Sequence, residues 1–195
     1  GNSVGSLDAI AGAVSAVDGV TAAYVVDNST AAAVTTGGIS LAAHSLYVCV
    51  NGGADQDVAL AILSKKAPGC GYTGTTTVTV TDPNSHYQTP PTYAVSFTRA
   101  ADTPLYFTVK IKDSAAVPST AATQIQAAIL AAFEEDGGDA GIIGGTVYAS
   151  AYYAAVAALG AWAKIMEITV GTAASPTGLT AALNINQIPT LDTAS

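Results

Sequence analysis

The residues that most often perform catalysis are few in this chain, and their spacing favours neither a nucleophilic triad nor a metal site. His44 precedes an apolar stretch, His86 lies in a polar stretch, and no serine stands in the Gly-x-Ser-x-Gly turn that exposes a nucleophile. The histidines are 42 positions apart and Cys49 and Cys70 are 21 apart, whereas zinc ligands cluster. Because Cys49 lies inside an apolar run, we expect free thiols and no structural metal.

Carboxylates and glycines gather in short stretches that complete no known ligand pattern. Residues 134–139 contain four carboxylates but lack the alternating ligands and final glutamate of a calcium-binding loop, so we expect a solvated helix end. The glycine-rich stretches 52–53 and 69–74 lack the Gly-Lys-Ser/Thr ending that binds phosphate. Asp55 and Asp57 are better explained as capping residues. The sequence therefore predicts no enzyme, no catalytic or metal-binding residue and no cofactor.

The composition argues against two classes of partner. Of 195 residues only 10% are charged, and six lysines and arginines against 14 aspartates and glutamates give a formal net charge of −8, so nucleic-acid binding is not expected. The longest weakly polar run, 148–163, is shorter than the roughly 20 residues that a membrane helix needs, and we read it as a buried helix. Half of the residues are hydrophobic, enough for a core. The start without methionine indicates a fragment of a longer protein.

Hydrophobic periodicity predicts an α+β protein with about four helices. We expect Ser6 and Asp55 to cap the first two helices, 31–43 to be a connection and 82–91 to be an exposed hairpin tip. Three alternating strands with no helix between them predict an antiparallel sheet. The expected helices are 7–17, 55–66, 119–133 and 147–159, and the expected strands are 20–26, 46–50, 76–81, 93–97, 105–112, 165–170 and 179–185.

These elements suggest two intimately packed lobes joined by a sheet segment. The predicted division is a helix-strand-strand-helix lobe over 1–74, an antiparallel segment over 75–113 and a helical and strand lobe over 114–195. The order of helix, glycine and strand in the first lobe returns in the last, so an approximate internal repeat is one interpretation. The alternative is that α+β domains reuse the same boundary signals.

Several blocks of sequence resemble the baseplate J-like proteins of contractile-tailed, Mu-like bacteriophages. The likeness spans most of residues 4–171 and is made of short blocks without a catalytic fingerprint. Its clearest blocks are His44-Ser-Leu-Tyr-Val-Cys-Val-Asn-Gly-Gly-Ala-Asp55, Lys65-Lys-Ala-Pro-Gly-Cys-Gly-Tyr-Thr-Gly74, Val95-Ser-Phe-Thr-Arg99 and Pro104-Leu-Tyr-Phe-Thr-Val109. The positions that match the recurring ones of the family, each read as a turn, cap or packing residue, are His44, Gly52, Gly53, Asp55, Ala59, Gly69 and Gly74.

The resemblance implies a structural wedge component of a phage tail baseplate. Such a protein would contact other baseplate and tail proteins and copies of itself, in the virion tail and, during assembly, in the host bacterial cytoplasm. Family members are usually longer, and the cysteine pair, the high alanine content and Pro90-Pro91 are not family features. The family has no catalytic residues to transfer.

A cell-wall or carbohydrate-binding tail module is the alternative function. The loops 69–74 and 82–91 would form its surface, and Tyr72, Tyr87 and Tyr93 would stack on sugar rings. The same tyrosines are better explained as packing and loop aromatics. A hydrolase is disfavoured because no carboxylate pair stands out.

Overall fold

The computed structural model describes residues 3–192, and the chain forms two compact units. Unit 1 comprises Gly1–Ala101 and Asn184–Asn186, and unit 2 comprises Asp102–Leu183 and Gln187–Ser195. The described residues form four α-helices with mixed and antiparallel sheets, which confirms the predicted α+β class. The intimate packing of two lobes and the divisions at 74 and 113 stay predictions.

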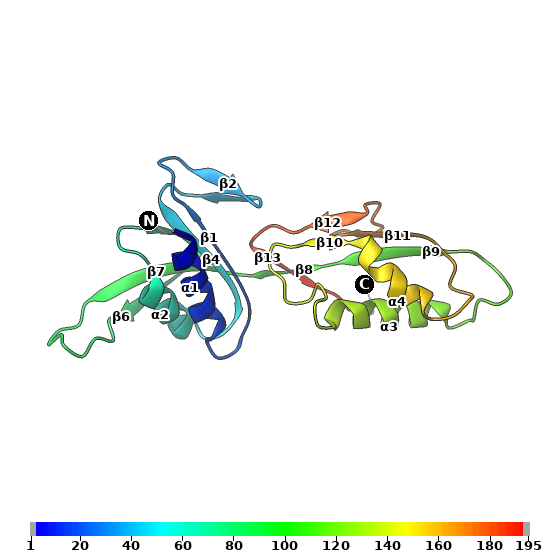
Figure 1. The fold of residues 1–195 in the computed structure, drawn as a ribbon, viewed down its shortest axis with the longest axis horizontal. Helices are drawn as coiled ribbons and strands as arrows, with labels where there is room; N and C mark the ends of the chain where they lie inside the picture. The colour runs from blue at the N-terminus through cyan, green and yellow to red at the C-terminus, as the bar shows by residue number, and fades with distance from the viewer. Residues whose placement is uncertain (1–2, 193–195) are drawn as a thin grey trace. The chain divides into compact units, whose positions relative to one another are not determined.

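A five-stranded sheet forms the framework of unit 1, with two helices packed on one face (Figure 1). The strand order is β1-β4-β7-β6, in which the outer pairs are antiparallel and β4 and β7 are parallel. The short β5 lies parallel to the first residues of β4. The elements are α1 (Ser3–Ser15), β1 (Val20–Asn28), β4 (Ser45–Gly52), α2 (Asp55–Lys65), β5 (Gly71–Thr73), β6 (Thr76–Thr81) and β7 (Thr92–Arg99).

Strand β4 is buried on both faces, as the continuous apolar run predicts. On one face Leu46, Val48 and Val50 pack in a cluster with residues of both helices and of β7. On the other face Tyr47 and Cys49 are at most 1% exposed. The Tyr47 hydroxyl donates a hydrogen bond of 3.0 Å to the carbonyl oxygen of Ile185, so its only polar atom is satisfied inside unit 1.

Unit 2 packs helix α3 and a short helical segment against paired strands. Strand β9 pairs antiparallel with β11, β10 pairs antiparallel with β12, and β8 pairs with β13. Inside the core, the rings of Phe107 and Tyr152 meet edge to face at 4.7 Å. The elements are β8 (Ala101–Pro104), β9 (Tyr106–Ile111), α3 (Ala121–Glu134), β10 (Thr146–Tyr148), a 3₁₀ turn (Ala149–Tyr152), α4 (Tyr153–Ala157), β11 (Ile165–Gly171), β12 (Thr180–Ala182) and β13 (Gln187–Thr190).

The expected connection over 31–43 is wrong, because it contains a hairpin of β2 (Val34–Thr36) and β3 (Ile39–Leu41). Gly37 and Gly38 form its two-residue turn with φ of 51° and 80°, which glycine adopts without strain. The paired glycines between β-branched residues were the missed signal.

The helix expected over 147–159 is also wrong in its first half. Val147 lies opposite Ala181 in the β10–β12 ladder, and α4 has only five residues. Alanine and tyrosine permit a helix here, but pairing with a distant strand decides the backbone conformation. For the same reason the strand expected over 179–185 ends at Ala182.

The predicted antiparallel sheet of three consecutive strands forms only in part. Strands β6 and β7 pair as expected, but β9 pairs with β11 in unit 2. Alternation along β9 correctly predicts a strand but does not identify its neighbour. Ser6, the expected N-cap, lies inside α1.

Candidate protein-binding surface

The turn after β4 is held by Arg99. Its guanidinium donates hydrogen bonds to the carbonyl oxygens of Gly52 (2.6 Å) and Gly53 (2.8 Å) and forms an ion pair with Asp55. The prediction that Asp55 caps α2 is wrong, because Ala54 is the N-cap and the Asp55 carboxylate accepts from Arg99 instead. Gly52 and Gly53 both have positive φ, and the contacts of the Arg99 guanidinium hold the tight turn that they form.

The other positions on which the resemblance rests also lie in turns or in the core. His44 adopts φ of 49° in the turn before β4, and both its backbone N–H and C=O groups are hydrogen-bonded. Ala59 is fully buried, and Gly69 is in a turn with φ of 80°. A Cβ atom at Gly74 would lie 2.7 Å from the backbone nitrogen of Phe97, so that position needs glycine for close approach.

Thiols and carboxylates form no reactive cluster in the described part of the chain. Cys49 and Cys70 are free, and burial raises the pKa of the Cys49 thiol to about 11. Residues 134–136 are exposed at the end of α3, while Asp139 accepts a hydrogen bond of 2.6 Å from the Tyr152 hydroxyl. Within residues 3–192 no group of three or more His, Cys, Asp or Glu side chains is placed to hold a metal ion.

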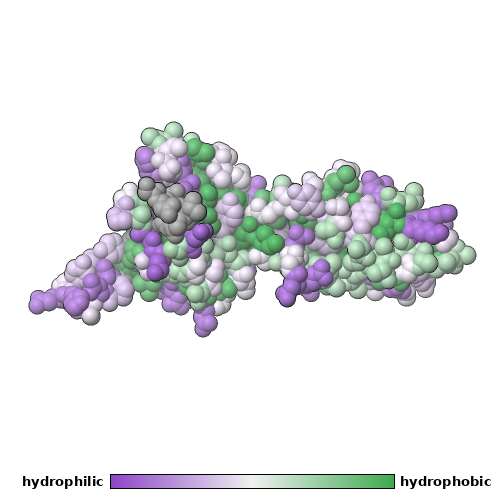
Figure 2. Space-filling view, in the orientation of Figure 1, coloured by the Kyte–Doolittle hydropathy of each residue, from purple (hydrophilic) through white to green (hydrophobic). Residues whose placement is uncertain are grey.

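The outer face carries little charge. Figure 2 shows pale and green atoms over much of the visible face, with the strongly hydrophilic atoms in separate groups, one of them at the hairpin tip 82–91. Among the described helices, none combines the length and the hydrophobicity needed to cross a bilayer.

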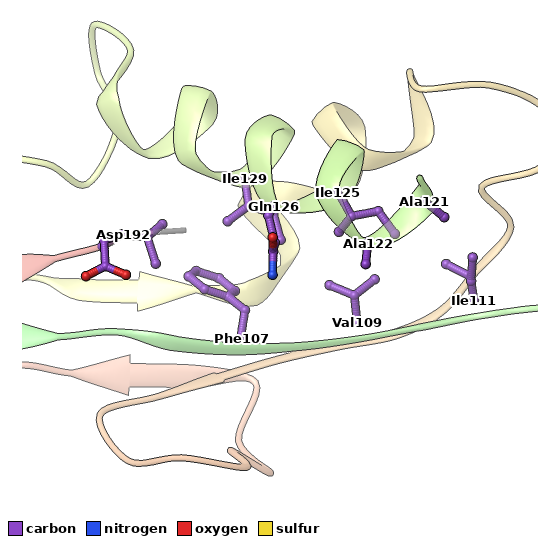
Figure 3. A pocket seen from close by; sticks show the side chains of 10 residues that line it. Phe107, Val109, Ile111, Ala121, Ala122, Ile125, Gln126, Ile129 and Asp192 are labelled. Atoms are coloured by element: carbon purple, nitrogen blue, oxygen red, sulfur yellow. The ribbon is translucent and has the colours of Figure 1, made fainter. Parts of the chain in front are cut away.

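An apolar groove of about 330 Å³ lies between β9 and α3 of unit 2 (Figure 3). Alternate side chains of β9 point toward α3, and small and branched side chains of α3 face them (Figure 3). The lining consists of Phe107, Val109, Ile111, Ala121, Ala122, Ile125, Gln126, Ile129, Leu191 and Asp192.

The groove is open to solvent although most of its atoms are hydrocarbon. Phe107, Val109 and Ile125 are only half-buried, even though they pack against the core of unit 2. The polar side chains of Gln126 and Asp192 are exposed. Exposed apolar surface of this kind marks sites where proteins bind one another, because covering it removes hydrocarbon from water.

A second groove, of about 790 Å³, lies in unit 1 between the end of α2 and the β6–β7 hairpin. Tyr93 lines it together with Lys66 and Asp82. Tyr87 does not line it, and Tyr72 lies half-buried under Lys66 with 4.9 Å between the Lys66 Nζ atom and the ring centre. The structure therefore brings one of the three predicted tyrosines into a groove.

The sequence predicts the elements that line the unit 2 groove but not its openness. The strand expected over 105–112 and the helix expected over 119–133 supply most of the lining residues. Whether a neighbouring strand covers these residues depends on pairing between distant residues, which periodicity does not encode.

Comparison with known proteins does not narrow the function further, because no family model matches the chain and no curated protein matches it.

Proposed function

We propose that this chain is a structural component of the tail baseplate of a contractile-tailed bacteriophage, where it assembles with copies of itself and with other baseplate proteins. The open apolar groove of unit 2 is the observation that favours a role in assembly. The blocks of sequence similar to the baseplate J-like family suggest the phage tail as the setting. In this role the protein is no enzyme and works in the virion tail, after assembly in the host bacterial cytoplasm.

A surface poor in charge suits such a role. Assembly buries surface, and each buried charge without a partner loses its hydration. With 10% charged residues, the chain can bury broad areas of alanine, threonine and glycine at a small electrostatic cost. The grooves of the two units then supply apolar surface for contact with neighbouring proteins.

Immunolabelling of tail particles tests the proposal. An epitope inserted at the hairpin tip 82–91, which is exposed over most of its length, leaves the cores of both units untouched. Negative-stain images should show antibody at the baseplate end of particles that carry the tagged chain, and none on untagged particles. Label on the sheath or the fibres alone, or absence of the tag from purified tails, would contradict the proposal.

A carbohydrate-binding tail module is the second candidate function, and the unit 1 groove is the observation that favours it. Tyr93 is 40% exposed there beside an ammonium and a carboxylate, a combination that binds sugar rings and hydroxyl groups. Peptidoglycan fragments at millimolar concentration should shift the NMR signals of the native chain and of Tyr87→Ala, but not those of Tyr93→Ala. The absence of shifts in the native chain would exclude this candidate.

A further inference from the structure

A further groove of unit 2 lies where β10 pairs with β12, and we call it the β10–β12 groove (Figure 1). Its volume is about 520 Å³, within the roughly 300–1,000 Å³ of sites that bind small molecules. The β10–β12 ladder places Tyr148 opposite Thr180, and both side chains are exposed while the neighbouring Val147 is buried. The two side chains therefore lie on the outer face of this pair of strands. The lining consists of Tyr148, Ala149, Ser150, Tyr153, Leu179 and Thr180.

The β10–β12 groove presents apolar surface to solvent. Tyr148 is 55% exposed and Leu179 is 63% exposed. The N–H of Ala149 donates to the carbonyl oxygen of Leu179 at 2.9 Å, which holds the two lining segments together. Tyr153 packs against the core of unit 2, and its hydroxyl accepts a hydrogen bond of 3.1 Å from the N–H of Ile168. An exposed ring beside a fixed ring is a preorganised surface for the apolar face of a ligand.

Hydroxyl groups accompany this apolar surface. Within the described residues, no hydrogen bond engages the side-chain hydroxyls of Tyr148, Ser150 and Thr180. Each of these hydroxyls can both donate and accept a hydrogen bond. A ligand that itself carries hydroxyl groups can pair with all three, whereas a purely apolar partner would cover them and leave them unpaired.

The sequence around the β10–β12 groove is free of charge. Residues 140–163 and 168–191, which contain the whole lining, include no Asp, Glu, Lys, Arg or His. The lining therefore offers no cation to pair with a phosphate or a carboxylate, and no carboxylate to bind a metal ion. A ligand that fits this groove is neutral, because a charge buried there would lose its hydration without gaining a partner.

We propose that the β10–β12 groove binds a neutral oligosaccharide of hexose units. A hexose ring carries C–H groups on its faces and hydroxyl groups around its rim, which matches aromatic surface accompanied by hydroxyls. Tyr148 stacks on one sugar ring, and Ser150 and Thr180 exchange hydrogen bonds with its hydroxyl groups. This site is separate from the unit 1 groove, which is lined by Lys66 and Asp82, and it does not depend on the proposed role in the baseplate.

An NMR titration of the native chain with neutral oligosaccharides of glucose, galactose or mannose tests the proposal. One stacked ring and a few hydrogen bonds give weak binding, so we expect a dissociation constant of about 1 mM and a titration up to about 20 mM sugar. The amides of Tyr148, Ser150, Leu179 and Thr180 should shift with at least one of these sugars. If none of the sugars shifts these amides, the inference is overturned.

Two variants separate the ring from the hydroxyls. Tyr148→Ala removes the stacking ring and should weaken binding by about five- to tenfold. Thr180→Val removes one hydroxyl but keeps a β-branched residue in β12, and should weaken binding by about two- to fivefold. Both positions are exposed, so the NMR signals of the unit 2 core should stay as in the native chain.

Variants of unit 1 show whether the sugar binds in the proposed groove. Tyr87→Ala is the matched control, because it removes an exposed tyrosine at the hairpin tip and should bind like the native chain. Native affinity in Tyr148→Ala would overturn the inference. Loss of binding in Tyr93→Ala would overturn it too, because the sugar would then lie in the unit 1 groove.

Two further measurements test the nature of the occupant. Galacturonate oligomers carry a carboxylate on each ring and should bind at least about tenfold more weakly than galactose oligomers, because the groove offers no cation. Equal or tighter binding of galacturonate would contradict a neutral ligand. Sedimentation velocity of the native chain and of Tyr148→Ala tests whether a second copy occupies the groove instead. Sedimentation that the substitution leaves unchanged supports the inference, and self-association that it abolishes overturns it.

Discussion

Gly52 is the position where a single added methyl group should disturb unit 1 most. Its φ is 80°, and a Cβ atom there would lie 2.0 Å from the carbonyl oxygen of Gly19. Gly69 has the same φ of 80° but open space around its Cβ direction, so Gly69→Ala is a matched control. The pair of variants separates the effect of backbone conformation from the effect of close approach.

The expected losses follow from those two effects. A left-handed conformation lowers the unfolding free energy by about 1–2 kcal/mol when the residue is not glycine. Alanine also reduces the entropy of the unfolded chain, which raises the unfolding free energy by about 0.4–1 kcal/mol. Gly69→Ala should therefore lose about 1 kcal/mol of unfolding free energy or less. Gly52→Ala adds a clash with backbone that overpacked sites resolve at about 1–3 kcal/mol, so about 3 kcal/mol is expected in total.

Urea unfolding, followed through the hydrogen exchange of the β4 amides, measures both losses in unit 1. With a denaturant dependence of about 1.5 kcal/mol per molar, Gly52→Ala should unfold at about 2 M less urea and Gly69→Ala at less than about 1 M below the native chain. Equal shifts for the two variants would refute the reasoning, because they would show that the contact between Gly52 and Gly19 is not held rigidly.

Three further predictions concern buried polar groups. Tyr152→Phe keeps the ring but removes the hydrogen bond to Asp139, and should lower the unfolding free energy of unit 2 by about 1–2 kcal/mol in urea titrations. Burial, with the neighbouring thiol, raises the pKa of Tyr72 to about 12 from 10, so the unfolded chain ionises first and stability should fall as the pH rises from 10 to 12. In Tyr72→Phe the stability should fall less between pH 10 and 12. If it falls as much as in the native chain, other groups cause the loss. Iodoacetamide at pH 8 should modify Cys70 in the native chain and Cys49 only after unfolding, as measured by mass spectrometry, because Cys49 is fully buried with its pKa raised to about 11.

The elements that the sequence predicts well are those whose signals are local. The helix from Asp55 to Lys65 has acidic residues in its first turn, a lysine in its last and Pro68 beyond it, and the structure places α2 within one residue of the expected bounds. Strands β4 and β6 likewise stand between clear turn residues. In each case the pattern that defines the element lies inside the element or next to it.

What the sequence does not predict depends on residues far apart. The β9–β11 ladder places Val109 opposite Ile168, and no feature of 105–112 encodes that pairing. The openness of the groove depends also on where β13 ends, at Thr190. Helix α3 lies close to the bounds expected for it, 119–133, but a helix pattern alone does not show how much of its apolar face the strands cover.

The net charge of the chain predicts how salt concentration should affect association between copies. Each copy carries a formal −8, so two copies repel one another at low ionic strength. The apolar groove of unit 2 offers little to offset that repulsion, because Asp192 is the single charged residue among those that line it. Raising the salt concentration from about 10 mM to about 150 mM shortens the screening length from about 30 Å to about 8 Å and should strengthen self-association in sedimentation experiments. An interface held by ion pairs would weaken over the same range, so weaker association at high salt would show that charged residues elsewhere hold the copies together.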